Sequence, residues 1–185
     1  MSTLEVNKLV PLADNGTITL GDSGDTFDVP AGATLDVTGA TVSGLTTGKI
    51  GQVVQNSGNG GVSTTSTSFV EAPISVTITP TAATSKIYVS IAFMNKTATD
   101  QEFIATIYRD PSGSSAVNLG DGTDGFFSDQ TRVANSKSLV YMQYLDSPNT
   151  TSLIEYKVYF KGEGQTVTAN NDEADWAFIA MEVLA

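Results

Sequence analysis

The chain has 185 residues, a formal net charge of −11 at pH 7, and neither Cys nor His. Without these two residue types the chain has no Cys/His zinc site, no thiol nucleophile, no disulfide and no catalytic triad that uses His. It carries 9 basic and 20 acidic residues. We therefore expect no binding to nucleic acid, because a phosphate backbone requires clustered Lys and Arg.

We expect no signal peptide in the first residues. The opening "MSTLEVNKLV" has neither the basic n-region nor the apolar h-region of a signal peptide. No apolar run approaches the roughly 18 residues needed to span a bilayer, so we expect no membrane insertion. Hydrophobic residues make up 40% of the chain, which is enough to build a packed core.

Residues 1–48 are predicted to form an N-terminal attachment arm and a β stem. Apolar residues there fall in pairs one residue apart, with Gly, Asp and Pro between the pairs, which is typical of very short strands. So few buried side chains cannot offset the entropy of ordering about 45 residues. We therefore expect these residues to pack against two other copies of the chain around a three-fold axis; the alternative is a flexible linker. The predicted packing residues are Ile18, Leu20, Phe27, Val29, Leu35, Val37 and Val42.

A Gly-, Asn- and Ser-rich connector is predicted at 49–68, followed by an all-β head at 69–185. Apolar and polar residues alternate through "ISVTIT" at 74–79, "KIYVSIAFMN" at 86–95 and "SLIEYKVYFK" at 152–161. This alternation indicates antiparallel sheets with one buried and one exposed face. We predict an antiparallel, jelly-roll-like β-sandwich.

Two segments of the head break this alternation. "SLVYMQYL" at 138–145 and "WAFIAMEVLA" at 176–185 are apolar at positions that face both ways along a strand. Central strands and strands at a subunit interface both have this pattern. The two segments are therefore our candidates for the contact between subunits.

The segment "DGTDGFFSDQ" at 121–130 holds three carboxylates, those of Asp121, Asp124 and Asp129. Calcium prefers several oxygen ligands, so these residues are a candidate metal site. The spacing is not that of an EF-hand, since the sixth position is not Gly and the twelfth is not Glu. Ordinary turn and loop chemistry explains the cluster equally well.

Asp175 and Trp176 lie just before the last predicted strand. A carboxylate beside an aromatic ring is a candidate receptor or interface contact, because sugars stack on exposed Trp side chains. The alternative is a charged loop followed by a Trp of the core. Arg109, Asp110 and Arg132 are candidates for ion pairs or contacts between chains.

Several segments of the second region resemble, in order, a domain of fibre-like virion structural proteins of tailed phages, especially marine ones. The matching segments are "GQVVQ" at 51–55, "STSFVEAPISVTITP" at 66–80, "SKIYVSIAF" at 85–93, "IYRD" at 107–110, "NLGDG" at 118–122, "YLDSPNTTSLIEYKV" at 144–158 and "FIAMEV" at 178–183. The opening "STLEVNKL" and the stretch "GTITLGDSGDTFDVPAGATLDVTG" resemble the stem that precedes this domain.

This resemblance implies a homotrimer with a slender stem and a β-sandwich head, somewhat like trimers of the tumour-necrosis-factor type. It implies a place in the virion, which is assembled in the cytoplasm of an infected bacterial host, and tail or capsid proteins as partners. A short fibre or fibre tip for host attachment is the first expectation, with a host surface glycan as candidate receptor. A capsid decoration or cement protein and a carbohydrate-binding module are the alternatives.

The sequence contains no nucleophile elbow, P-loop, dinucleotide fingerprint or zinc signature. We therefore expect no enzymatic activity and no catalytic residue. We also expect no cofactor, apart from the candidate calcium ion described above.

Overall fold

The computed structural model describes residues 26, 28–37, 49–111, 115–170 and 174–184. The chain divides into two compact units, Met1–Leu45 and Thr46–Ala185. Within the described residues, no helix has the length and hydropathy that crossing a membrane requires.

The described part of the second unit consists of β-strands joined by turns and loops. The strands are β1 (Ile50–Gly58), β2 (Val62–Thr64), β3 (Val70–Ile78), β4 (Lys86–Thr97), β5 (Gln101–Pro111), β6 (Val117–Asn118), β7 (Phe127–Thr131), β8 (Ser136–Asp146), β9 (Ile154–Lys161), β10 (Val167–Ala169) and β11 (Trp176–Val183).

The strands pair as a hairpin that has been rolled up. β5 pairs with β7, β4 with β8, β3 with β9, β2 with β10 and β1 with β11, all antiparallel and each pair nested inside the next. Further pairing of β4 with β11 and of β5 with β9 joins these ribbons into sheets. This nesting defines a jelly roll and confirms the predicted fold.

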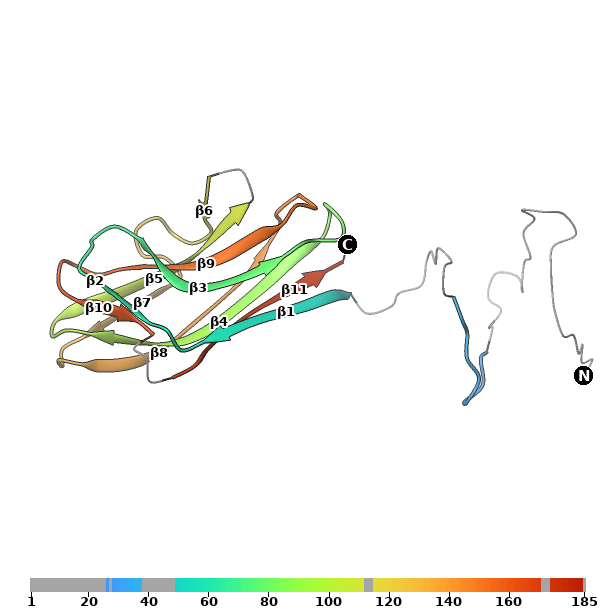
Figure 1. The fold of residues 1–185 in the computed structure, drawn as a ribbon, viewed down its shortest axis with the longest axis horizontal. Helices are drawn as coiled ribbons and strands as arrows, with labels where there is room; N and C mark the ends of the chain where they lie inside the picture. The colour runs from blue at the N-terminus through green and yellow to red at the C-terminus, as the bar shows by residue number, and fades with distance from the viewer. Residues whose placement is uncertain (1–25, 27, 38–48, 112–114, 171–173, 185) are drawn as a thin grey trace, which may run out of the picture. The chain divides into compact units, whose positions relative to one another are not determined.

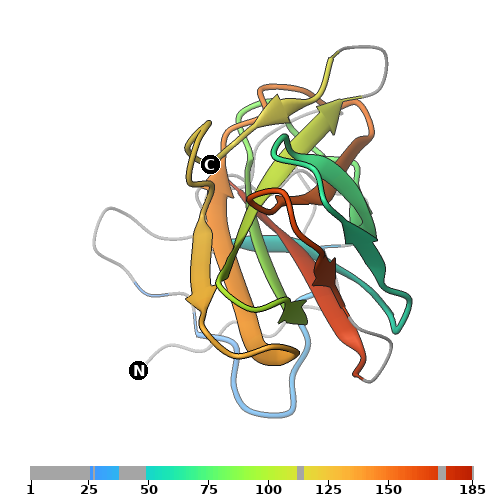
Figure 2. The ribbon, with the colours of Figure 1, turned by 90° about the vertical axis from the view of Figure 1, so that its left-hand side faces the viewer.

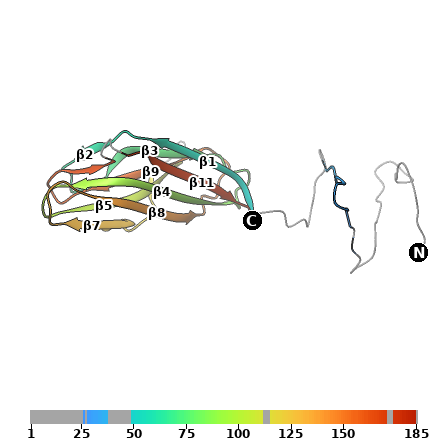
Figure 3. The same ribbon diagram turned by 90° about the horizontal axis from the view of Figure 1, so that it is seen from below.

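Two sheets result, and they stack face to face (Figures 1 and 2). Sheet A has the order β1-β11-β4-β10-β2, and β8 lies on the other side of β4. Sheet B has the order β3-β9-β5-β6, with β7 also paired to β5. Seen from below, β8 runs alongside β4 as the outermost strand of sheet A (Figure 3).

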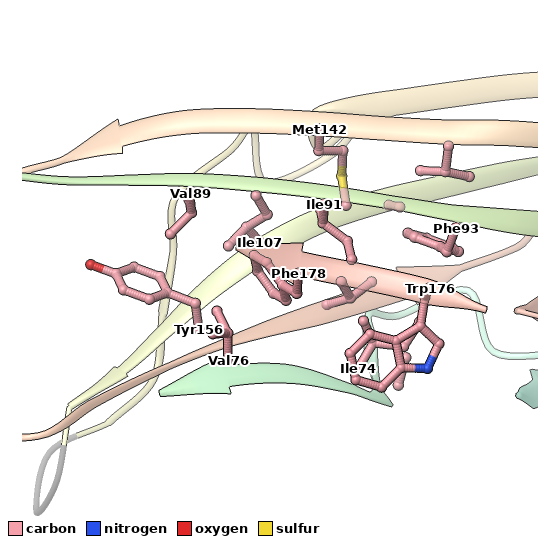
Figure 4. Close-up of a cluster of buried hydrophobic side chains, with 14 of the residues drawn as sticks. Ile74, Val76, Val89, Ile91, Phe93, Ile107, Met142, Tyr156, Trp176 and Phe178 are labelled. Carbon is pink, nitrogen blue, oxygen red and sulfur yellow. The ribbon is translucent and has the colours of Figure 1, made fainter. Parts of the chain in front are cut away.

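The core fills the space between the sheets because inward residues alternate with outward ones. In β9, the inward side chains of Ile154, Tyr156, Val158 and Phe160 are fully buried. The ring of Phe160 stacks on Phe103 at 5.6 Å between centroids. Figure 4 shows inward side chains from both sheets meeting in this layer, including those of Ile74, Ile91, Met142 and Phe178.

The predicted connector at 49–68 is wrong for most of its length, because it contributes two strands to sheet A. β1 pairs with β11 from Ile50 to Gly58, and β2 pairs with β10. The amide of Leu184 donates to the carbonyl of Lys49 at 2.7 Å, which joins the two ends of this unit. The Gly- and Asn-rich sequence suggested a loop, but backbone pairing with β11 and β10 supplies the order that the side chains do not.

The described part of the predicted stem, residue 26 and residues 28–37, contains no strand. It forms a turn in which the amide of Ala33 donates to the carbonyl of Pro30 at 3.0 Å. Val29, Leu35 and Val37 are exposed in the single chain. The prediction of short strands is therefore wrong for these residues in the single chain. The packing of Val29, Leu35 and Val37 against other copies stays a prediction. Ile18, Leu20, Phe27 and Val42 lie outside the described residues.

Gly61 permits a close approach of two backbones. A Cβ atom at this position would lie 1.4 Å from the carbonyl oxygen of Asn170. The side-chain amide Nδ2 of Asn170 meanwhile donates to the carbonyl of Asn59 at 2.8 Å, which fixes the same loop. We expect Gly61→Ala to lower the free energy of unfolding by about 2 kcal/mol or more, because rigid backbone cannot yield.

The neighbouring Gly60 provides the matched control. A Cβ atom there would meet nothing within 4 Å. Gly60→Ala should therefore change the free energy of unfolding by no more than about 0.5 kcal/mol. Chemical denaturation of both variants checks this, and equal stabilities would contradict the close approach at Gly61.

Candidate interaction surface

The outward side of sheet A carries an unusual set of side chains. Its members come from the four long strands β1, β11, β4 and β8, whose registers place them on one face. We name this surface the sheet A face. It comprises Val53, Gln55, Ser57, Lys86, Tyr88, Ser90, Ala92, Met94, Lys96, Lys137, Leu139, Tyr141, Gln143, Leu145, Ala177, Ile179, Met181 and Val183.

Most of the sheet A face is apolar, although its outer strands are exposed. The exposed fractions are 56% for Val53, 61% for Leu139, 52% for Tyr141 and 46% for Leu145. A sheet that packs on one side only normally shows polar residues on the other. An apolar patch that extends across four strands is larger than scattered surface hydrophobics and is typical of an interaction site.

The two segments predicted as interface candidates meet on this face. Residues 138–145 lie in β8 and residues 176–183 span β11, and the two strands flank β4 on opposite sides. Their inward residues enter the core, and their outward residues form much of the sheet A face. This explains why both segments are apolar at positions that face both ways. Their contact with another subunit stays a prediction.

The sheet A face carries no carboxylate, although the whole chain has 20 acidic residues. Its only charged side chains are those of Lys86, Lys96 and Lys137, which lie near the ends of β4 and β8. The middle of the face is therefore uncharged in a chain whose net charge is −11.

Four polar side chains in the middle of the face bond to one another. The hydroxyl of Tyr88 donates to Oε1 of Gln143 at 2.6 Å, and that of Tyr141 donates to the same atom at 3.2 Å. The hydroxyl of Ser90 donates to Oη of Tyr141 at 3.2 Å. Hydrogen bonding with Tyr141 raises the pKa of Tyr88, whereas hydrogen bonding with Ser90 and Tyr88 lowers the pKa of Tyr141. The three hydroxyl donors are thus used within the face, whereas Nε2 of Gln143 takes no part in these bonds.

The outward side of sheet B has the opposite character. The ammonium group of Lys157 lies 3.0 Å from a carboxylate oxygen of Asp110 and 3.4 Å from those of Glu71 and Glu155. The hydrogen bond with Asp110, together with the other two carboxylates, raises the pKa of Lys157. Burial and the hydrogen bond to Glu71 raise the pKa of Tyr159 to about 12. This side is charged, as expected for a solvent-facing sheet.

A partly buried ion pair lies at the edge of the core. Nη1 of Arg109 donates to both carboxylate oxygens of Asp146, at 2.8 and 3.0 Å. The buried hydroxyl of Tyr156 donates to the same carboxylate at 2.8 Å. Burial, and then the nearby Asp146 charge, raise the pKa of Tyr156. Arg109 and Asp110 were expected to form ion pairs, and both do, Arg109 with Asp146 and Asp110 with Lys157. The partner of Arg109 is 37 residues away, and no local motif signals that pairing.

A second buried carboxylate, that of Glu182, lies at an inward position of β11 and is fully buried. It accepts hydrogen bonds from the amide of Thr81 at 2.7 Å, the hydroxyl of Thr81 at 2.8 Å and Nε2 of Gln52 at 2.8 Å. Burial disfavours its charge, but these hydrogen bonds together outweigh burial and lower the pKa of Glu182 to about 2. In "WAFIAMEV", Glu182 has the same phase as the inward apolar residues. This alternation could have identified Glu182 as a buried carboxylate.

The candidate metal residues do not come together. The carboxylate of Asp121 accepts hydrogen bonds from the amides of Thr123 at 2.7 Å and Asp124 at 2.9 Å, which is an Asx turn. These two backbone bonds, Asp124 first, lower the pKa of Asp121. Asp129 lies in β7 and accepts a hydrogen bond from the hydroxyl of Ser138. Across the described residues, no three acidic side chains gather as a metal site would require.

Trp176 belongs to the core. Its side chain is 5% exposed and points between the sheets, where its ring packs closely against Gly58 (Figure 4). The exposed sugar platform at Trp176 is therefore wrong, and the alternative, a Trp of the core, is confirmed, because the inward phase of β11 places residue 176 beside Phe178 and Ala180. Asp175 is exposed at the start of β11, and a contact there stays a prediction.

Comparison with known proteins gave few matches. No family model and no curated protein matches the chain. Among solved structures, a chain of the "Structure of infectious bursal disease virus Gx strain" is 13% identical, with a TM-score of 0.40. The match covers 72% of this chain and 37% of that one, so this chain spans well under half of that relative's length.

Proposed function

We propose that this protein is a non-enzymatic structural subunit of a tailed-phage virion, which works as a homotrimer projecting from the particle surface. In this proposal it is a short fibre or fibre tip for host attachment. The jelly-roll unit is the head, and the first 45 residues attach the head to the particle. The observation that carries the proposal is the sheet A face, because an exposed and mostly apolar sheet face without carboxylates is typical of a subunit that works in an assembly.

The division of the chain supports the same proposal. The head is a separate compact unit that begins near Thr46, and the preceding unit carries exposed apolar residues at Val29, Leu35 and Val37. A segment of this kind gains stability when copies of it pack together or against a partner. Three heads on one attachment segment would also raise weak individual contacts to useful avidity.

Immunogold labelling of intact phage particles tests this proposal. Antibodies raised against the protein should label particles that carry it, at the tail or tail tip. Label over the capsid would instead support the decoration protein as the function, and the proposed fibre role would be wrong. Particles without any label, from a lysate in which the protein is detected, would overturn the virion proposal altogether.

A further inference from the structure

The sheet A face has few charged side chains, whereas a sheet surface that faces water normally has many. One row of outward residues runs in register from Leu145 of β8 through Tyr88 of β4 to Met181 of β11, and no member of it is charged. On the other sheet, the corresponding outward positions hold an ion-pair network around Lys157. The same chain therefore has one side suited to solvent and one side suited to being covered.

We propose that the sheet A face is the surface through which copies of this chain contact one another, an inference that rests on the proposed homotrimer. The partner that covers the face is a second copy of the chain, and the distribution of acidic side chains supports this choice. Copies that each carry −11 repel one another, so a stable contact requires a surface without acidic side chains. The sheet A face has none, and its few lysines lie near the strand ends.

The polar groups of the face permit this contact. Burying a hydroxyl or amide without a hydrogen-bond partner is costly. In the middle of the sheet A face, Tyr88, Ser90, Tyr141 and Gln143 already bond to one another. A second copy can therefore cover the three hydroxyl groups with apolar side chains without leaving their donors unpaired, and it must supply an acceptor for Nε2 of Gln143.

The size of the face is also sufficient. Four strands about 4.8 Å apart, each about nine residues long at about 3.4 Å per residue, cover roughly 600 Å² in projection. A stable interface takes about 800 Å² of accessible surface from each partner. Side chains that stand on such a sheet expose more area than its projection, so the face can supply most of one interface.

Thiol labelling measures whether the face is covered. The chain has no Cys, so Leu139→Cys and Thr77→Cys each introduce a single thiol. Leu139 is 61% exposed in one chain and lies on the sheet A face, whereas Thr77 is exposed on the outward side of β3. We expect maleimide to react at least tenfold more slowly with the Leu139→Cys variant of the full chain than with the Thr77→Cys variant. The mass of each variant is measured by light scattering at the same concentration.

The outcomes separate this inference from the proposed function. Protection of residue 139 in a chain with a trimer's mass supports the inference. Equal labelling rates in a chain with a trimer's mass overturn it and leave the proposed trimer, which must then form elsewhere. Protection in a chain with the mass of a monomer also overturns it, since the chain's own first 45 residues would cover the face. Equal rates in a monomer overturn both the inference and the trimer.

A charged substitution gives an independent readout that needs no labelling. Leu139→Glu places a carboxylate on β8, the outermost strand of the face, where it would lie against the neighbouring copy. We expect this variant to fall to the mass of a single chain, whereas Thr77→Glu should keep the wild-type mass. A Leu139→Glu variant that keeps the full mass would overturn the inference.

Discussion

Replacing Asp146 with Ala should lower the free energy of unfolding by about 3 kcal/mol, because it removes a buried carboxylate that accepts hydrogen bonds from the partly buried Arg109 and from Tyr156. Asp146 is 5% exposed and accepts hydrogen bonds from Arg109 and from the buried hydroxyl of Tyr156. Its loss leaves the guanidinium group and the phenol without their acceptor, in a place that water cannot fully reach. Chemical denaturation at a fixed protein concentration measures the effect.

Two matched variants separate the charge from the shape. Asp146→Asn keeps the volume and one acceptor oxygen, so it should cost less than Asp146→Ala. Tyr156→Phe removes only the phenol hydroxyl and leaves the ion pair, so we expect a loss of about 1 kcal/mol. If Asp146→Ala proves no more costly than Tyr156→Phe, the ion pair does not contribute to the stability of the head in the way that we infer.

The stability of the wild-type protein should fall, relative to that of Glu182→Gln, as the pH decreases from about 4.5 to about 2. The pKa of Glu182 is about 2 in the folded chain, below its ordinary value of 4.5. The unfolded chain therefore takes up this proton first, and protonation favours unfolding. The stabilisation that the charged carboxylate provides is fully present above about pH 4.5 and is lost as the pH approaches 2.

Thermal unfolding of both proteins across this pH range checks the prediction. Other carboxylates titrate in the same range, so the informative quantity is the difference in Tm between wild type and Glu182→Gln. We expect that difference to be largest near neutral pH and to shrink toward pH 2. A difference that stays constant over the whole range would show that the charge of Glu182 is not what its hydrogen bonds stabilise.

Local alternation was enough to predict the sandwich. The pattern of "ISVTIT" and "SLIEYKVYFK" places the same residues inward that the structure buries, from Ile74 to Phe160. β1 and β2 were missed because Asn, Gly and Ser weaken the alternation there. Their order comes from backbone hydrogen bonds to strands more than 100 residues later in the chain, which no local pattern reports.

The sequence predicted two of the segments that form the sheet A face, but not how they join. The segments 138–145 and 176–185 are apolar on both sides, and this property alone marked them as interface candidates. That β4 lies between them and completes one continuous face depends on the non-local pairing of the jelly roll. The Arg109–Asp146 pair and the bonding of Tyr88 with Gln143 depend on the same pairing, so the sequence alone could not have predicted them.

The mass of the full chain in solution tests the central claim most directly. The proposed homotrimer predicts a light-scattering mass about three times the 19.3 kDa of one chain, constant on dilution through the micromolar range. A mass of 19.3 kDa at every concentration would contradict the trimer and leave the sheet A face without the partner that we propose.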